Sequence, residues 1–197
     1  MSGVDPGSPA SKAILRRDGR RRLESLTAES RVASADLVVR RILDHPNTPG
    51  PGRLSGVLAY LGDGIEIDLD PTIEQLFQLD IPVAVPGVLE TRGSMVPVKL
   101  DSLNDLDQDR YGLRVPRKPW IPMDPDALSV VLVPGVAFTK NGHRLGRGGG
   151  YYDRLLSTLP ETVIRIGVCH EVQVVEEIPI EAHDAVMDEI LIIPAPG

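Results

Sequence analysis

Glycines, arginines and one carboxylate are concentrated in the stretch from Arg144 to Arg154, which reads RLGRGGGYYDR. Glycine lets the backbone approach a ligand closely and adopt dihedral angles that other residues avoid, so successive amide groups can converge on phosphate oxygens. Arg144 and Arg147 flank the glycines, and guanidinium groups suit phosphate recognition. The stretch therefore predicts a loop that binds a phosphate-bearing ligand.

Asp153 follows these glycines, in the first turn of a predicted helix. Its carboxylate is well placed to meet a phosphate-bound magnesium ion, because magnesium prefers oxygen ligands. Three glycines before a helix could also be only a tight connection without a ligand. The glycine order matches neither a Walker A loop nor a dinucleotide fingerprint, so the spacing alone indicates phosphate without naming a nucleotide.

The N-terminal segment is rich in basic residues. Ser8 followed by Pro9 predicts the start of a helix that carries Lys12, Arg16 and Arg17. Such charge runs are most often a solvated helix face. The pattern alone therefore favours a structural role for these side chains.

Acidic candidates occur at two other places. Glu66 and Asp68 alternate with isoleucines, as the outward residues of a half-buried strand would. Asp184 and Asp188, four residues apart, could form a metal pair if their segment were helical, and His183 beside them could be a general base. We favour Asp188 as a ligand and a structural role for His183.

Cys169 and Trp120 are each the single residue of their type in the chain. Cys169 precedes His170, but adjacent residues on a strand point to opposite faces, so a buried, unreactive cysteine is expected. Trp120 lies in a proline-rich segment, where it could cover a ligand or anchor the segment to the core.

The elements that would position these residues alternate between strands and helices. Periodic apolar residues predict a helix that is capped by Thr27 and extends to Leu43, and Asp70-Pro71 opens another that ends near Leu79. Short apolar runs predict strands at 55–61, 81–85, 96–100, 130–133 and 163–168. The polar segment 101–126 is expected to be a long loop over the site. The alternation favours an α/β sheet with helices on both faces and ligands beyond the carboxyl ends of the strands.

Composition narrows the class of protein. The 197 residues, 42% of them hydrophobic and 25% charged, suit one globular domain over residues 1–197. A net charge of −7 argues against nonspecific nucleic-acid binding. The single cysteine, the lack of a secretory signal and the absence of an apolar run of about 20 residues predict a cytoplasmic protein without a membrane span.

The stretch from Arg144 to Arg154 closely resembles the signature of the 5-formyltetrahydrofolate cyclo-ligase family, and a PGxAF-like element precedes it at Pro134–Phe138. The resemblance extends to Lys12 and Arg16 in a KxxLR-like start, to Glu66-Ile67-Asp68, and to an HDxxMD motif at His183–Asp188. It implies a single three-layer α/β domain with a central, largely parallel sheet flanked by helices, similar to the NagB/RpiA/CoA transferase-like fold.

The resemblance also implies an activity. Members of the family use ATP and Mg²⁺ to close 5-formyltetrahydrofolate into 5,10-methenyltetrahydrofolate, with release of ADP and phosphate, and we expect a monomer or a weak homo-oligomer. The ATP-binding residues that it implies are Lys12, Arg16, Arg144, Leu145, Gly146, Arg147, Gly148, Gly149, Gly150, Tyr151 and Tyr152. Lys12, Arg147 and Tyr152 would take part in catalysis.

Metal and folate sites follow from the same resemblance. Asp153 and Asp188 match the positions that coordinate magnesium. Glu66 matches the folate-site glutamate, and the candidates to line that pocket are Leu61, Met95, Trp120 and Tyr152.

Two positions depart from the family pattern: Val115 replaces a frequent glutamate, and Ile192 replaces a frequent threonine. A noncatalytic relative that binds folate or nucleotide is therefore an alternative. A sugar-phosphate isomerase or acyl-transfer enzyme on a similar scaffold is another, because fold alone does not fix function.

Overall fold

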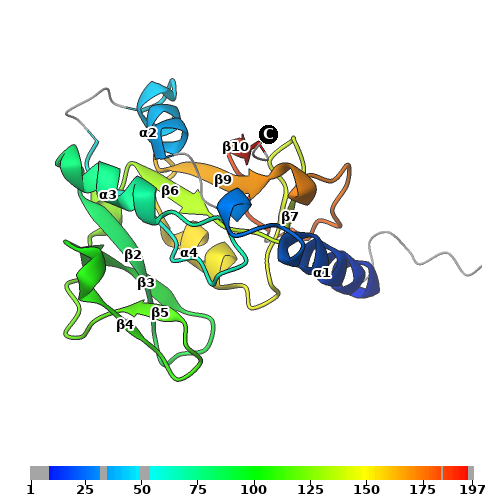
Figure 1. Ribbon diagram of the computed structural model, residues 1–197, viewed down its shortest axis with the longest axis horizontal. Helices are drawn as coiled ribbons and strands as arrows, with labels where there is room; N and C mark the ends of the chain where they lie inside the picture. The colour runs from blue at the N-terminus through cyan, green and yellow to red at the C-terminus, as the bar shows by residue number, and fades with distance from the viewer. Residues whose placement is uncertain (1–8, 32–34, 49–53, 183, 195–197) are drawn as a thin grey trace, which may run out of the picture.

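A computed structural model describes residues 9–31, 35–48, 54–182 and 184–194. Its centre is a six-stranded sheet in the order β10-β9-β6-β1-β2-β3 (Figure 1). The strands are β1 (Val57–Leu58), β2 (Val83–Val88), β3 (Met95–Leu100), β6 (Val130–Val133), β9 (Ile164–His170) and β10 (Glu189–Ile193). Neighbouring strands pair in parallel except β2 and β3, which are antiparallel. The largely parallel α/β sheet is thus confirmed.

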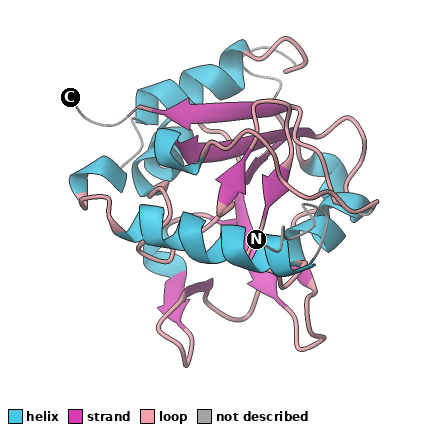
Figure 2. Ribbon diagram, turned by 90° about the vertical axis from the view of Figure 1, so that its right-hand side faces the viewer, coloured by secondary structure: helices cyan, strands magenta, loops and turns pink. Residues whose placement is uncertain are grey.

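Helices cover both faces of this sheet (Figure 2). They are α1 (Pro9–Glu24), α2 (Ala35–Asp44), α3 (Asp70–Gln78) and α4 (Tyr151–Thr158). Successive side chains of a strand point to opposite faces, so Leu132 packs in one core cluster with α2 and α3 while Val131 packs in the other with α4. Strands buried on both faces carry continuous apolar runs, which explains the sequence VVLV of β6.

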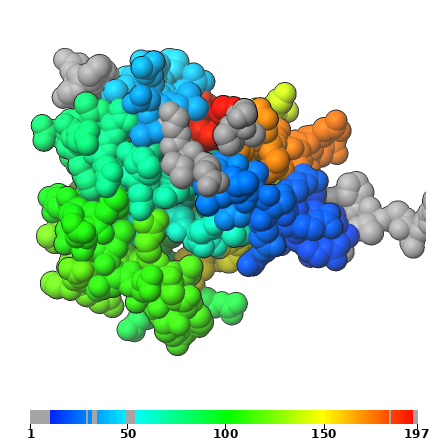
Figure 3. All heavy atoms as spheres, viewed as in Figure 1, coloured from blue at the N-terminus to red at the C-terminus, as the bar shows by residue number. Residues whose placement is uncertain are grey.

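Two small hairpins accompany the sheet. Strands β7 (Ala137–Phe138) and β8 (Arg144–Leu145) connect the end of β6 to the glycine-rich loop. Strands β4 (Leu106–Gln108) and β5 (Arg114–Pro116) lie beside β2 and β3. The space-filling view shows this green region and the blue helix α1 as separate parts of one face (Figure 3).

Several boundaries differ from the sequence-based expectations. The segment 101–126 is not a structureless loop: it holds the β4–β5 hairpin and the turns η2 (Leu103–Asp105) and η3 (Pro125–Ala127). The carboxylate of Asp109 closes the hairpin, because it accepts hydrogen bonds from the backbone of Tyr111 and Leu113. The expected strand over 55–61 is only the two residues of β1.

The helix expected after Thr27 begins later. The Thr27 hydroxyl accepts a hydrogen bond from the Ser30 amide and caps a short 3₁₀ turn, η1 (Glu29–Arg31). The α-helix α2 starts at Ala35, and residues 32–34 of the predicted helix lie outside the described residues. The helix opened by Asp70-Pro71 is confirmed as α3.

Candidate functional site

Arg144 connects the end of β6 to the start of α4. Its guanidinium donates to the Pro134 carbonyl at 3.2 Å and to an Asp153 carboxylate oxygen at 2.7 Å. The side chain is only 4% exposed, and its Nε has no partner among the described residues. Arg144 therefore fixes the frame of the glycine-rich loop, and Asp153 supplies its counter-ion.

The glycines of the loop adopt conformations that other residues avoid. Gly148 has φ +95° and Gly150, which precedes α4, has φ +67°. A Cβ atom at Gly148 would lie 3.3 Å from the Arg16 guanidinium. The loop backbone thus approaches its neighbours closely, and the first turn of α4 adds the partial positive charge of a helix N-terminus.

Helix α1 lies against this loop. Arg16 donates from Nε to the Gly146 carbonyl at 3.0 Å. Lys12, one turn earlier on the same face, is buried, and its ammonium lies 2.9 Å from both Glu181 and Asp184. Burial opposes the charge on Lys12, but these two carboxylates outweigh it and raise the pKa of the ammonium. The structure thus brings Lys12 and Arg16 to one side of the loop and holds Lys12 in ion pairs.

Arg147 extends from the loop to two largely buried acids. Its Nη2 lies 2.5 Å from Asp63 and 3.1 Å from Glu66. The carboxylate side chains are 15% and 12% exposed, whereas that of Arg147 is 46% exposed. The phosphate-loop candidate and the folate-site candidate are therefore in direct contact.

Asp63 was not predicted as a site residue. It lies in the turn Gly62-Asp63-Gly64, where its Oδ1 accepts from the amides of Ile65 and Glu66. This turn directs the Glu66 side chain inward, so the interpretation of Glu66 as an outward strand residue is wrong. The Gly-Asp-Gly sequence was the available signal, because such triplets close turns through the aspartate side chain.

Burial controls the ionisation of the groups around Glu66. Burial raises the pKa of Glu66 to about 7, while Arg147 lowers it and Asp63 raises it. Burial also raises the pKa values of the Tyr60 and Tyr152 hydroxyls. The Tyr152 hydroxyl is buried without a partner among the described residues, and the ring lies 5.7 Å from the Arg144 guanidinium carbon.

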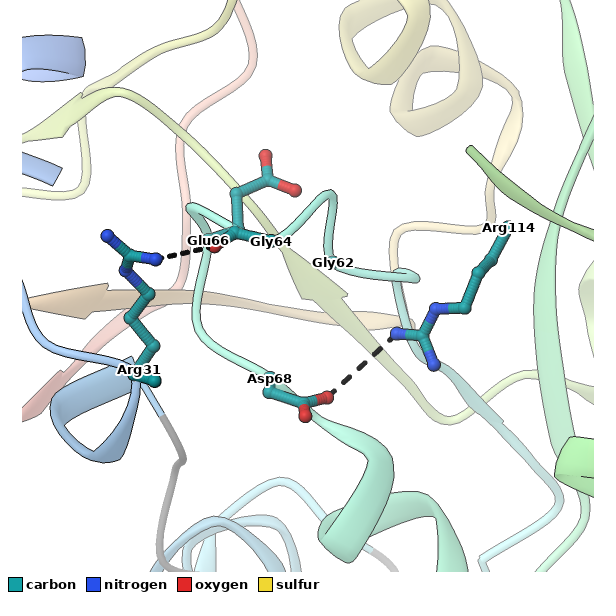
Figure 4. A pocket seen from close by; sticks show the side chains of 7 residues that line it. Arg31, Gly62, Gly64, Glu66, Asp68 and Arg114 are labelled. Carbon is teal, nitrogen blue, oxygen red and sulfur yellow. Dashed lines mark hydrogen bonds and ion pairs between the residues drawn. The ribbon is translucent and has the colours of Figure 1, made fainter. Parts of the chain in front are cut away.

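A hollow of about 420 Å³ opens beside these groups (Figure 4). Arg31 and Arg114 lie on opposite sides of it, with the loop that carries Glu66 between them. Arg114 pairs with Asp70 at 2.5 Å and lies 3.9 Å from Asp68. Pockets of this size hold small organic molecules. The residues that line it are Ala28, Arg31, Gly62, Gly64, Glu66, Asp68 and Arg114.

Comparison with known proteins decides the family. The model of the 5-formyltetrahydrofolate cyclo-ligase family matches residues 8–193. This chain belongs to that family. A 5-formyltetrahydrofolate cyclo-ligase of Mycolicibacterium smegmatis is 34% identical over 146 residues, which cover 71% of this chain and 75% of the relative. One of Mus musculus is 25% identical and covers 92% and 93%.

Solved structures of the cyclo-ligase family agree with this fold. A 5,10-methenyltetrahydrofolate synthetase of Aquifex aeolicus matches with a TM-score of 0.73 and 26% identity, covering 93% of this chain and 89% of that one. None of the helices in the described segments has the length and apolar character of a membrane-spanning helix.

The structure does not bring every residue expected from the cyclo-ligase family to the hollow. Trp120 lies elsewhere: its indole donates to the Pro116 carbonyl at 2.8 Å, and the ring packs against Gly87 of β2. The segment is thus anchored to the sheet, the second of the two roles considered for Trp120. Met95 is buried in the core beside α4, and Leu61 is half-buried next to Gly62.

Asp188 is also placed away from the glycine-rich loop. Its carboxylate accepts from the Arg165 amide at 2.7 Å, at the amino ends of β9 and β10, whereas Asp153 lies near the carboxyl end of β6. In the part of the chain that the structure describes, no three His, Cys, Asp or Glu side chains are grouped as a metal site. His183 lies outside the described residues.

Cys169 is buried, as expected. Burial raises the pKa of its thiol to about 12, which keeps it protonated and unreactive. His170 is also buried, and its Nε2 lies 2.5 Å from the Ser30 carbonyl oxygen. Neither residue contributes a group to the hollow.

Proposed function

We propose that this chain catalyses the ATP- and Mg²⁺-dependent closure of 5-formyltetrahydrofolate to 5,10-methenyltetrahydrofolate, with release of ADP and phosphate. The observation that carries the proposal is the contact of Arg147 with Glu66, because it joins a glycine-rich loop suited to phosphate with a hollow suited to a small organic molecule. Membership of the cyclo-ligase family supports the same reaction.

The reaction proceeds in two steps. The γ-phosphoryl group passes from ATP to the formyl oxygen of the folate, which gives the formyl carbon a good leaving group. Nitrogen-10 of the folate then attacks this carbon and loses its proton to water, while the carbon-oxygen bond breaks and phosphate departs. The protein's contribution is to position the two substrates and to neutralise charge.

Residues around the loop would bind ATP. The amides of Gly146 and Gly148–Gly150 would hold phosphate oxygens, with Arg147 and Arg16 close by. Lys12 would add a charge on the same side after leaving Glu181 or Asp184. Tyr152, whose buried hydroxyl is without a partner among the described residues, would hydrogen-bond the substrate.

Magnesium fits Asp153 as a ligand. Mg²⁺ typically takes one or two carboxylates and completes its shell with substrate phosphates and water. Asp153 supplies a carboxylate at the first turn after the glycines, and we do not assign Asp188 to the same ion because the structure places it at the other end of the strands. When bound, the ion would neutralise charge on the phosphates.

Glu66 would bind the folate. It is the less exposed of the two carboxylates that line the hollow, and the turn that contains Asp63 fixes its backbone. Val115 and Ile192, the two departures from the family pattern, are not among the residues that line the hollow. Their positions in the described structure therefore give no reason to favour a noncatalytic relative.

Stoichiometry tests the proposal. Purified protein with Mg²⁺, ATP and 5-formyltetrahydrofolate should form one ADP for each folate consumed, and ADP should not accumulate when the folate is omitted. Folate-independent ADP formation would contradict the proposal, and so would a folate that disappears without ADP.

A further inference from the structure

Arg147 differs from the other arginines around the loop in what holds it. Arg16 donates to the Gly146 carbonyl and Arg154 to the carbonyls of Gly93 and Gly149. Arg144 donates to the Pro134 carbonyl as well as to the Asp153 carboxylate. In the described structure Arg147 instead pairs with two carboxylates, on Asp63 and Glu66. Arg147 is thus the loop arginine whose position depends on charge rather than on backbone hydrogen bonds.

Asp63 is built to hold this guanidinium. Its Oδ1 accepts from the amides of Ile65 and Glu66 at 3.2 and 3.3 Å, which fixes the carboxylate and leaves Oδ2 directed at Arg147. Glu66 shares the same Nη2 atom. Two carboxylates therefore face one guanidinium, so an anion that approaches Arg147 meets an excess of negative charge.

The ion pairs of Arg147 oppose the binding of phosphate at the glycine-rich loop. The attraction between Arg147 and a phosphate is reduced as long as both acids pair with it, and the acids repel the phosphate directly. Hydrogen-bond donors on a ligand in the hollow would engage Glu66 and weaken its hold on Arg147. The charge of Arg147 would then become available to the loop.

We propose that Asp63 and Glu66 hold Arg147 in a resting ion-pair cluster that weakens ATP binding until the folate engages Glu66, so that the two substrates bind cooperatively. The proposal rests on the proposed function, which places ATP at the loop and the folate at Glu66. Asp63 is then a positioning residue that acts through Arg147. By linkage, ATP strengthens folate binding by the same factor.

Calorimetric titration of Asp63→Asn with a nonhydrolysable ATP analogue and Mg²⁺ tests this. The side-chain oxygen of the introduced asparagine can still accept hydrogen bonds from the backbone amides of the turn. Arg147, however, then faces one carboxylate instead of two. The Kd of the analogue should fall by roughly fivefold relative to wild type, the size of one partly exposed ion pair. Addition of 5-formyltetrahydrofolate should lower the Kd by a similar factor in wild type and hardly at all in Glu66→Gln, which lacks the carboxylate that the folate would engage.

Asp68→Asn is the matched control, because Asp68 lines the same hollow but pairs with Arg114 rather than Arg147. It removes the same charge and should leave the Kd of the analogue within about twofold of wild type. Glu66→Gln is a second variant, should Asp63→Asn fail to fold, and it should also tighten analogue binding.

The possible results distinguish a failure of the proposed coupling from a failure of the proposed function. An unchanged Kd of the ATP analogue in Asp63→Asn and Glu66→Gln overturns the coupling, because the two acids would then not weaken ATP binding. A raised Kd overturns it as well, and would show that the two acids only keep the turn in shape. Equal tightening in Asp68→Asn overturns it too, because the effect would be one of general charge. If wild-type protein does not bind the analogue at all, the proposed function itself fails.

Discussion

Glu66→Gln should change how the stability of the protein depends on pH. The unfolded chain ionises Glu66 near 4.5, whereas burial raises the pKa of Glu66 in the folded protein to about 7. Below 4.5 both states hold the proton, so the stabilising contribution is fully present. As the pH rises toward 7 the unfolded state releases its proton first, and the contribution is lost.

The size of this effect follows from the two pKa values. Each tenfold change in proton affinity is worth about 1.4 kcal/mol, so the difference between 4.5 and about 7 corresponds to about 3 kcal/mol. Glutamine cannot ionise and does not show this loss. The free energy of unfolding of Glu66→Gln should therefore rise relative to that of wild type by about 3 kcal/mol between pH 4.5 and pH 7 and stay level above.

Urea unfolding followed by circular dichroism at a series of pH values measures this difference. Glu161→Gln, which removes a carboxylate from an exposed position, is the control and should follow the wild-type curve in this pH range. Parallel curves for wild type and Glu66→Gln would show that Glu66 titrates as an ordinary surface carboxylate, and the description of a buried acid restrained by Arg147 would fail.

Three further substitutions test the site. Asp153→Asn should sharply reduce turnover, because magnesium loses a carboxylate ligand. It should also lower the free energy of unfolding by about 3 kcal/mol, because buried Arg144 loses its counter-ion. Wild-type turnover of this variant at low magnesium would show that Asp153 is not a magnesium ligand. Gly150→Ala, at φ +67°, should lower the free energy of unfolding by about 1 kcal/mol and weaken binding of an ATP analogue, and unchanged binding in titration would contradict the loop geometry. Trp120→Phe should lower the free energy of unfolding measured in urea by about 1 kcal/mol, because the hydrogen bond to the Pro116 carbonyl is lost. The KM for folate should stay within about twofold of wild type, and a large rise in KM would show that Trp120 lines the folate site.

Some elements could be predicted from the residues of a single segment. The four apolar residues of β6 and the Asp70-Pro71 start of α3 were predicted because burial and capping act over a few neighbours. The glycine-rich loop was also recognisable, since no other composition permits its positive φ angles so readily. The strand β10 was not among the predicted strands, although its apolar run Ile190–Ile193 ends at Pro194.

Long-range pairing could not be predicted in this way. Arg147 meets Asp63 across more than eighty residues of sequence, and no local pattern encodes that contact. The alternation around Glu66 imitates a half-buried strand, and only the side chain of Asp63, which caps the turn, directs Glu66 inward. Lys12 shows the same limit: its charge was recognised, but its pairing with Glu181 and Asp184 depends on a distant segment.

The most direct test of the central claim is the ultraviolet absorbance of 5,10-methenyltetrahydrofolate after purified protein is mixed with 5-formyltetrahydrofolate. The absorbance should rise only when ATP and Mg²⁺ are both present, and Arg147→Gln should slow the rise strongly. Absence of any rise with folded wild-type protein, or a rise that persists without ATP, would contradict an ATP-dependent cyclo-ligase.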